Sequence, residues 1–301
     1  MCAVPVVVLF GLLAATGYAL GTVLQQKVAL QAEEAVTGLR FLVQLFRRPV
    51  WLLGGVVMAV GWVCQAVALH LGSLVLVQSL VTLSLVISLP FGVWLTAQRI
   101  TRSVWLGASA LVAGIVLVLS VGSPQSGTRT PGTRDWWIAS CVSLGLALLL
   151  ARIGARRAGA VRALAYGAGA GLGYGLATAV TKVFTDVLGG GLAAVVGGWE
   201  VYLMAAAATV GLVLNQSALR TGALAPAMAA TNAMTLLACI VLGITVFGES
   251  FGPGTGHLAA VLAGLALALL GIVLLAGAPA SATRKQAIDE PAYVCNREAD
   301  S

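Results

Sequence analysis

The sequence predicts an all-α membrane protein of about nine transmembrane helices, in which two inverted four-helix repeats are joined by a connector helix. Three observations support this fold class. The 301 residues are 59% hydrophobic and only 9% charged, whereas a soluble domain carries about 25% charged residues. Apolar runs recur along the chain, each close to the roughly 20 residues that span a bilayer. Short sequences also recur in the same order in both halves.

Nine apolar runs are separated by short polar or charged segments. No basic segment precedes the first run, which is too long for a signal-peptide core, so a retained span is expected. Pro90 lies inside the third run, where its missing N–H predicts a kink. The expected spans cover residues 4–28, 50–70, 73–97, 103–121, 135–152, 162–187, 199–220, 223–247 and 257–278. The predicted units are a first repeat (1–121), a polar loop with the connector helix (122–160), a second repeat (161–278) and a disordered cytoplasmic tail (279–301).

Basic residues gather in alternate loops, and this bias indicates the orientation. With the N-terminus outside, 13 of the 17 Lys and Arg residues fall on the inner side, while the outer loops contain Arg129 and Arg134. Because membrane proteins keep Lys and Arg in cytoplasmic loops, a multi-pass protein of the plasma (inner) membrane is expected, with the C-terminus in the cytoplasm. The inner residues are Arg40, Arg47, Arg48, Arg99, Arg102, Arg152, Arg156, Arg157, Arg162, Arg220, Arg284, Lys285 and Arg297.

The net charge of +7 is spread between the apolar runs. It therefore predicts contact with the lipid bilayer and no nucleic-acid partner. Tryptophan placement agrees with this interpretation, because the amphipathic indole ring prefers the headgroup level of a membrane. The residues near span ends are Trp51, Trp94, Trp105, Trp136, Trp137 and Trp199.

Three short matches relate the two halves, at offsets of 156, 150 and 157 residues. The first span corresponds to the sixth, and the two are five membrane crossings apart. Because each crossing reverses the direction of the chain, spans separated by an odd number of crossings run in opposite directions. The halves are therefore expected to be inverted, an arrangement that places a binding site between repeats and permits alternating access. The matches are Gly17-Tyr18-x-Leu20-x-Thr22 with Gly173-Tyr174-x-Leu176-x-Thr178, Ala68-Leu69-His70-x-Gly72-x-Leu74 with Ala218-Leu219-Arg220-x-Gly222-x-Leu224, and Gly114-Ile115-Val116-Leu117 with Gly271-Ile272-Val273-Leu274.

The four-span unit, from TGYALGTVLQQK through AVALHLGSLVLVQSL and VWLTAQRI to GIVLVLS, resembles that of the drug/metabolite transporter superfamily in its EamA-like form. The layout is most similar to the NIPA-type magnesium transporter branch, with Gln26-Lys27 ending span one and Phe247-Gly248-Glu249 after span eight. The resemblance covers about residues 4–278 and implies a transporter of a small solute. The first span has no carboxylate, unlike that of the small multidrug resistance proteins, which argues against their mechanism of proton-coupled cation export.

Lys27 and Lys182 are the two lysines inside the expected spans, at comparable places in spans one and six. A charge in the hydrocarbon costs about 2.5–3.5 kcal/mol on insertion scales, so such residues are functional candidates. Two interpretations remain open. The lysines either line a cavity and attract an anionic group, or extend along the helix to the nearer membrane interface.

Uncharged polar residues are candidates to line the substrate cavity. Their amides and hydroxyls could contact a solute, or could hydrogen-bond between helices for about 0.6–2 kcal/mol each. The cavity candidates are Tyr18, Tyr174, Gln65, Gln78, Asn215, Gln216, Thr231 and Asn232, with Thr22 and Thr178 as further inner-face residues.

Acidic residues near the expected outer ends are weak metal candidates. Glu200, Asp186 and Glu249 could form a vestibule for a divalent cation, which prefers oxygen ligands, or could be solvated interface charges. His70 and His257 are interpreted as interfacial. The five cysteines (Cys2, Cys64, Cys141, Cys239 and Cys295) have no metal or disulfide spacing and are expected to serve as small packing residues.

These patterns predict a secondary transporter of a small solute, working by alternating access. The alternatives are a Mg²⁺ or other divalent cation permease of NIPA type and a non-transporting scaffold or lipid-handling protein. No nucleotide motif, metal-ligand cluster or nucleophile–base pair occurs in the sequence. Neither enzymatic activity nor a cofactor is therefore expected, and the oligomeric state, a homodimer included, stays open.

Overall fold

The computed structural model describes residues 3–30, 48–96, 102–121, 124–125, 127, 131–188, 196–219, 221, 224–251 and 255–276. Apart from one isolated β-bridge between Gln125 and Ser250, these residues contain helices, turns and coil. The helices are α1 (Ala3–Leu30), α3 (Pro49–Leu71), α4 (Leu74–Thr82), α5 (Ser84–Thr96), α6 (Arg102–Ser120), α7 (Thr133–Ala155), α8 (Gly159–Leu188), α10 (Trp199–Leu219), α11 (Leu224–Thr245) and α12 (Thr255–Ala276). The predicted tail lies outside the described residues, as does the Lys27 side chain.

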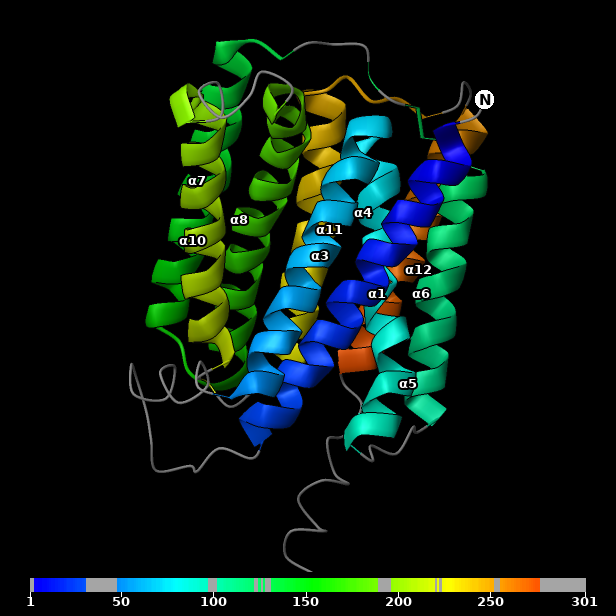
Figure 1. The fold of residues 1–301 in the computed structure, drawn as a ribbon, viewed down its shortest axis with the longest axis vertical. Helices are drawn as coiled ribbons and strands as arrows, with labels where there is room; N and C mark the ends of the chain where they lie inside the picture. Colours follow the sequence, from blue (N-terminus) through cyan, green and yellow to red (C-terminus); the bar gives the residue numbers. More distant parts are fainter. Residues whose placement is uncertain are drawn as a thin grey trace, which may run out of the picture.

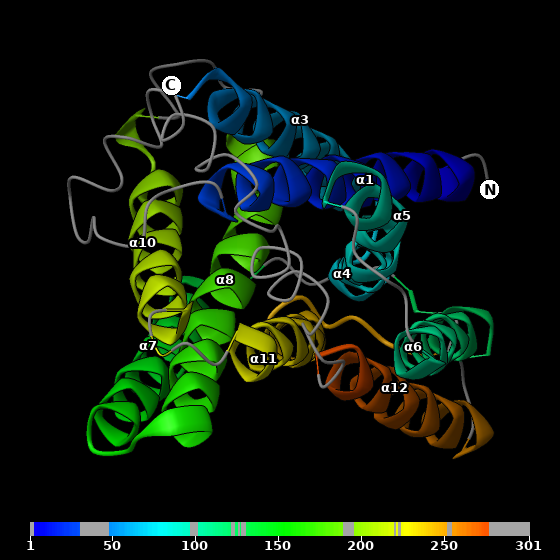
Figure 2. The same cartoon turned by 90° about the horizontal axis from the view of Figure 1, so that it is seen from below.

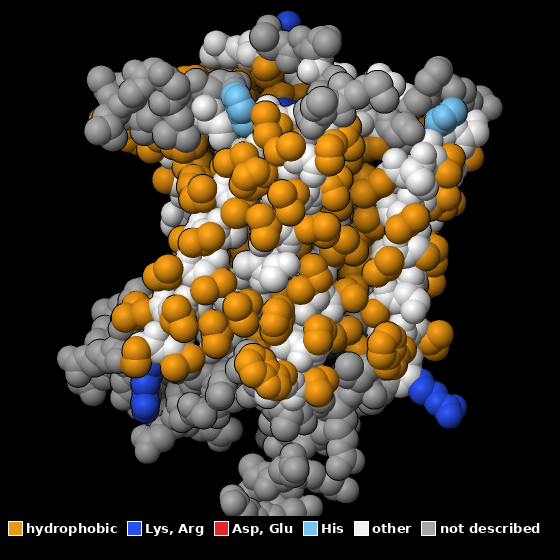
Figure 3. Space-filling view, turned by 45° about the vertical axis from the view of Figure 1, so that its right-hand side comes forward, with side chains coloured by type: hydrophobic (Ala, Val, Ile, Leu, Met, Phe, Trp, Pro, Cys, Tyr) orange, Lys and Arg blue, Asp and Glu red, His pale blue; other side chains and the backbone are white. Residues whose placement is uncertain are grey.

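The structure confirms an all-α, multi-pass membrane protein. Seven helical segments are long and apolar enough to cross a bilayer, and Val104–Ser120 is a shorter apolar helix. Helix α8 is not among the seven, because it is rich in Gly and Ala and carries Arg162, Lys182 and Asp186. Figure 3 shows hydrophobic side chains over the middle of one face, with basic side chains only near its ends. This apolar surface is what lipid, rather than water, solvates.

The helices form one bundle that runs along a common direction (Figure 1). Helix α8 packs against α7, α10, α11 and α3, while α1 packs against α3, α4 and α5. Figure 2 shows α6 beside α12 at one edge and α7 near α10 at the opposite edge. Helices α3, α6, α8 and α11 all finish, and α4 and α7 begin, at one end of the bundle. We call it the Glu249 end, after the residue that follows α11 there.

The third expected span is broken at Leu83, which separates α4 from α5. Pro90 lies inside α5, and the break at Leu83 comes about two turns before it. The kink expected at Pro90 stays a prediction. At the break, the Thr82 hydroxyl donates to the Gln78 carbonyl at 2.8 Å. The same bond occurs within unbroken helices, for example at Thr181 of α8, so it does not by itself explain the break.

Glycines allow close contact between neighbouring helices within each half. A Cβ atom at Gly17 of α1 would lie 2.9 Å from Cα of Gly61 in α3. In the second half, a Cβ atom at Gly173 of α8 would lie 2.8 Å from the nitrogen of Gly211 in α10. The absence of a side chain at these crossings brings the backbones together, the usual way in which membrane helices gain packing contacts.

Helices α6 and α12 make reciprocal contacts across their interface. A Cβ atom at Gly114 of α6 would lie 2.5 Å from the Ala268 nitrogen of α12. A Cβ atom at Gly271 of α12 would likewise lie 2.5 Å from the Leu111 nitrogen of α6. Each helix therefore presents a glycine to the backbone of the other, and the two backbones approach closely at two points.

Candidate functional site

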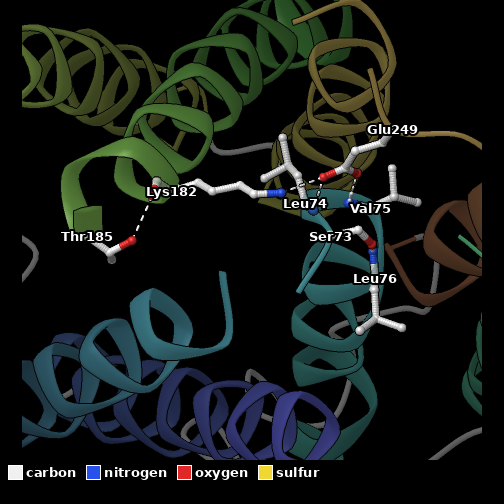
Figure 4. A network of polar contacts seen from close by, with 7 residues as sticks. All are labelled: Ser73, Leu74, Val75, Leu76, Lys182, Thr185 and Glu249. Carbon is white, nitrogen blue, oxygen red and sulfur yellow. Dashed lines mark hydrogen bonds and ion pairs between the residues drawn. The ribbon is translucent and has the colours of Figure 1, made fainter. Parts of the chain in front are cut away.

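A buried ion pair joins α8 to the turn after α11 at the Glu249 end. The Lys182 Nζ atom lies 2.7 Å from Oε1 of Glu249. The Glu249 side chain is 1% exposed and that of Lys182 is 15% exposed. Figure 4 shows the lysine extending from α8 toward the carboxylate, which lies over the first turn of α4.

The same carboxylate caps the N-terminus of α4. The Leu74 N–H donates to Oε1 of Glu249 at 2.5 Å, and the Val75 N–H donates to Oε2 at 3.0 Å. Ser73 is the N-cap residue, and its hydroxyl accepts from the Leu76 N–H at 3.1 Å. The first turn of a helix has N–H groups without intrahelical partners and a partial positive charge, so a carboxylate is stabilised there. We call Lys182, Glu249 and the two N–H groups of α4 the Glu249 cap.

The backbone after α11 places Glu249 over α4. The helix ends at Thr245, and Gly248 adopts a φ of 64°. Glycine enters this left-handed region without steric penalty, which makes it the favoured residue after a helix C-terminus. The Glu249 N–H donates back to the Gly243 carbonyl at 2.9 Å, so the turn folds against its own helix.

Aromatic side chains enclose the ion pair. The Lys182 Nζ atom lies 4.7 Å from the centroid of the Phe247 ring. Trp136 packs edge-on against Phe247, with centroids 5.9 Å apart, and also against Trp199, with centroids 5.4 Å apart. Trp136 is buried, so it packs inside the protein instead of anchoring the helix at the lipid headgroups. A ring face attracts a cation most strongly where water is excluded.

Two further contacts join α3 to α8 near the same end. The Thr185 hydroxyl lies 3.5 Å from Nδ1 of His70, and the rings of Trp62 and Phe184 have centroids 6.4 Å apart. The last turns of α8 therefore contact α3 and the turn after α11, and they reach α4 through the shared carboxylate. The two halves of the chain are held together at this end.

A second group of candidates forms pairs between helices inside each half. The Tyr18 hydroxyl of α1 donates to Oε1 of Gln65 in α3 at 2.6 Å. Tyr174 of α8 and Asn215 of α10 lie close enough for their side chains to interact. The Asn215 side chain also accepts from the Thr231 hydroxyl of α11, at 3.5 Å.

The remaining cavity candidates are placed differently. Gln78 is buried in α4, and its Oε1 atom has no hydrogen-bond partner among the described residues. The Asn232 side chain donates to the Met228 carbonyl of its own helix at 2.8 Å. Gln216 is exposed on the α10 face that carries the exposed Leu212 and Val213, so it does not join the Tyr174–Asn215 pair.

The acidic candidates do not form a metal centre among the described residues. In that part of the chain, no group of three or more His, Cys, Asp or Glu side chains is arranged to hold a metal ion. Glu200 is buried in the first turn of α10, and Glu249 is buried in the ion pair. The interpretation of these two residues as solvated interface charges was therefore wrong, and the Asp186 side chain lies outside the described residues.

The sequence analysis missed the pairing of Lys182 with Glu249, since it related Lys182 to Lys27 instead. The available signal was the position of two opposite charges at the same expected end of the sixth and eighth spans. The capping role of Ser73 was missed as well. A serine directly before an apolar run after a glycine is a common helix-start pattern.

The larger of the two described pockets lies away from these candidates. It has a volume of about 420 Å³ and is lined by apolar side chains of α7, α8 and α11, with Asp135, Ser143 and Thr245 as polar members. None of the predicted cavity residues lines it. In this conformation the polar pairs are therefore packed between helices and do not face that pocket.

A bacterial protein of uncharacterised function is similar to this chain. The relative, from Corynebacterium glutamicum, is 26% identical over 249 residues, which cover 81% of this chain and 85% of the relative. No family model and no solved structure matches the chain. The similarity extends over most of both proteins, and the relative's name supplies no activity.

Proposed function

We propose that the protein is a secondary transporter that moves a small solute by alternating access between two inverted repeats. The first repeat would be α1, α3, α4 with α5, and α6, and the second would be α8, α10, α11 and α12. Helix α7 would be the connector, which makes nine crossings. With the N-terminus outside, the Glu249 end would be the outer end of the protein.

The observation that carries this proposal is a set of contacts that recurs at the repeat offsets. Gly17 meets Gly61, and Gly173 meets Gly211. Gly173 lies 156 residues after Gly17, and Gly211 lies 150 residues after Gly61, which are the offsets of the sequence matches. Gly17 and Gly173 belong to the first sequence match, whereas Gly61 and Gly211 lie outside all three matches. The offset between these two contact partners therefore adds support for a duplication.

The polar pairs follow the same offsets. Tyr174 lies 156 residues after Tyr18, and Asn215 lies 150 residues after Gln65. Each half therefore places a tyrosine beside an amide side chain on the next helix of its repeat, and in the first half the two are hydrogen-bonded. Such groups can bind a small polar solute through hydrogen bonds, and they would be exchanged in role when the two halves exchange conformations.

The reciprocal contact of α6 with α12 supports a twofold relation. Gly114 meets Ala268, and Leu111 meets Gly271. The offset of 157 residues relates Gly114 to Gly271 and Leu111 to Ala268, so the two contacts are equivalent. When the same contact occurs twice across one interface, with the two sides exchanged, a twofold axis relates the two sides. Within one chain, such an axis between inverted halves lies in the membrane plane.

The Glu249 cap would close one end of the transport path in this conformation. It connects α8 and the α11 turn, in the second repeat, to α4, in the first. Opening that end separates the repeats, so the carboxylate would leave the N–H groups of α4 in the open state. A matched closure at the opposite end would then complete the cycle of alternating access.

Uptake into liposomes that contain the purified protein tests the proposal. A panel of amines, amino acids, sugars, nucleosides and Mg²⁺ would separate solute transport from the magnesium alternative. For a transported solute, Tyr174→Phe and Asn215→Ala should reduce uptake, because they remove the polar groups that the second repeat would offer to the solute. Tyr202→Phe is the matched control, because that hydroxyl is exposed and bonds the Val196 carbonyl. Proteoliposomes that carry none of these solutes would leave the scaffold alternative.

A further inference from the structure

A small polar pocket lies at the opposite end of the bundle from the Glu249 cap. It has a volume of about 200 Å³ and is lined by Arg162, Tyr166, Ser217 and Thr221. Arg162 and Tyr166 belong to the first two turns of α8, and Ser217 belongs to the last turn of α10. The pocket therefore forms where the start of α8 meets the end of α10.

Arg162 presents an unpaired donor in this region. Its Nε atom is buried and has no hydrogen-bond partner among the described residues. A guanidinium group does not lose its proton in a protein, so it cannot relieve burial by becoming neutral. A buried N–H without an acceptor is costly. The pocket is therefore incomplete without an acceptor, and for a guanidinium the best acceptor is an oxyanion.

Three further arginines lie at the end of α7 and in the turn that leads into α8. Arg152 lies in the last turn of α7, and Arg156 and Arg157 lie in the turn between α7 and α8. Within the described part of the chain, none of these arginines forms an ion pair. The sequence contains no Asp or Glu between Asp135 and Asp186, so α7 and the first turns of α8 offer no local counter-charge. Among the described residues, this end of α7 and α8 therefore carries positive charge that suits an anionic ligand.

Apolar residues next to the pocket indicate the source of the anion. Val161 and Leu164 are exposed on α8, and Leu212 and Val213 are exposed on α10. An apolar surface directly beside a basic helix end matches a phospholipid, whose acyl chains lie along the helices while its phosphate lies at the headgroup level. A free phosphate ion would make no use of the apolar surface.

We propose that this pocket binds the phosphate of an anionic phospholipid, with Arg162 as the residue that contacts the phosphate oxygens. Tyr166 borders the phosphate position. The Ser217 hydroxyl donates to the Val213 carbonyl at 2.7 Å, so its oxygen can accept from a headgroup hydroxyl such as those of glycerol. The site is independent of transport, because none of its residues belongs to the Glu249 cap or to the tyrosine–amide pairs.

Thermal unfolding of the full-length protein in neutral detergent tests the site. The probes are short-chain phosphatidylglycerol, phosphatidylcholine and inorganic phosphate. We expect phosphatidylglycerol to raise the melting temperature and to bind about tenfold more weakly to Arg162→Gln, which loses one charge-assisted interaction. Arg102→Gln is the matched control, because Arg102 begins α6 at the same end and is exposed but does not line the pocket.

Three outcomes would overturn the proposal. Equal stabilisation by inorganic phosphate would make the free ion the ligand. An equal loss of binding in Arg102→Gln would make the effect general surface electrostatics, and no difference between phosphatidylglycerol and phosphatidylcholine would remove the anion requirement. If Arg162→Gln does not fold, Arg162→Lys keeps the charge and removes Nε. This variant should still bind more weakly than the control, and wild-type affinity in it would also refute the role of Nε.

Discussion

At the scale of single residues, the protein buries a carboxylate and pairs it with a partly exposed lysine and with two main-chain N–H groups. Glu249 accepts three hydrogen bonds, from Lys182 and from the N–H groups of Leu74 and Val75. Taking two charges out of water is costly, and the mutual attraction only compensates when the remaining hydrogen-bonding groups are also paired. The geometry of the Glu249 cap meets this condition.

Removing one partner of this pair should destabilise the protein more than removing both. We expect Glu249→Ala or Lys182→Met alone to cost about 3–5 kcal/mol, because each leaves a buried charge without its partner. The double variant Lys182→Met with Glu249→Ala should cost less than either single change, and therefore less than their sum. Thermal unfolding in detergent, analysed as a double-mutant cycle, measures the coupling. Strictly additive effects would mean that the pair contributes no coupling energy.

Only part of the residue-scale site could be predicted. Lys182 and Glu249 were both identified, since a charge among apolar residues is conspicuous. Their pairing was not, because they are 67 residues apart and belong to different helices. Periodicity describes which face of one helix a residue occupies, and it does not indicate which two faces meet. The burial of Trp136 was missed for the same reason.

At the scale of helices, glycines set how closely neighbouring elements approach. Gly114→Ala should destabilise the protein, because its Cβ atom would lie 2.5 Å from the Ala268 nitrogen and force α6 and α12 apart. Gly145→Ala in α7 is the matched control, because a Cβ atom there meets nothing within 4 Å. The control should be neutral or slightly stabilising, since Ala favours a helix over Gly by about 1 kcal/mol. Melting temperatures that change equally would contradict the close contact.

The N-terminus of α4 has two caps, and the serine can be tested alone. Ser73→Ala removes the acceptor for the Leu76 N–H and should cost about 1 kcal/mol. Ser73→Asp keeps an acceptor at that position but places a second carboxylate beside Glu249, so it should not restore stability fully. Thermal unfolding of both variants separates the cap from the charge. Full recovery in Ser73→Asp would indicate that Glu249 exerts no electrostatic effect at Ser73.

The helices themselves were largely predictable, because an apolar run of fixed length has few alternatives in a bilayer. Helices α6, α11 and α12 begin and end within about two residues of the expected spans. The break at Leu83 was not predicted, since Pro90 offered a stronger local signal. The Thr82 hydroxyl bonds the carbonyl of Gln78 in its own helix. A threonine is a weaker sequence signal for a helix break than a proline is.

At the scale of the whole molecule, the orientation in the membrane remains a prediction. Single cysteines at position 132, before α7, and at position 157, after α7, lie at opposite ends of that helix. In a variant without native cysteines, a membrane-impermeant maleimide applied to intact cells should label position 132 and leave position 157 unlabelled. The physical reason is the cluster of arginines near position 157, which is retained on the cytoplasmic side. Labelling of position 157 alone would reverse the orientation.

The Glu249 cap has one consequence for how the chain can vary. Its contacts in the first repeat are two main-chain N–H groups, not side chains. Replacement of Leu74 or Val75 by almost any residue therefore leaves the donors in place, and only proline removes one. Mutational drift along the start of α4 can alter its packing without breaking the connection, whereas positions 182 and 249 have no such freedom. Tolerance to substitution should accordingly be unequal on the two sides of a single contact.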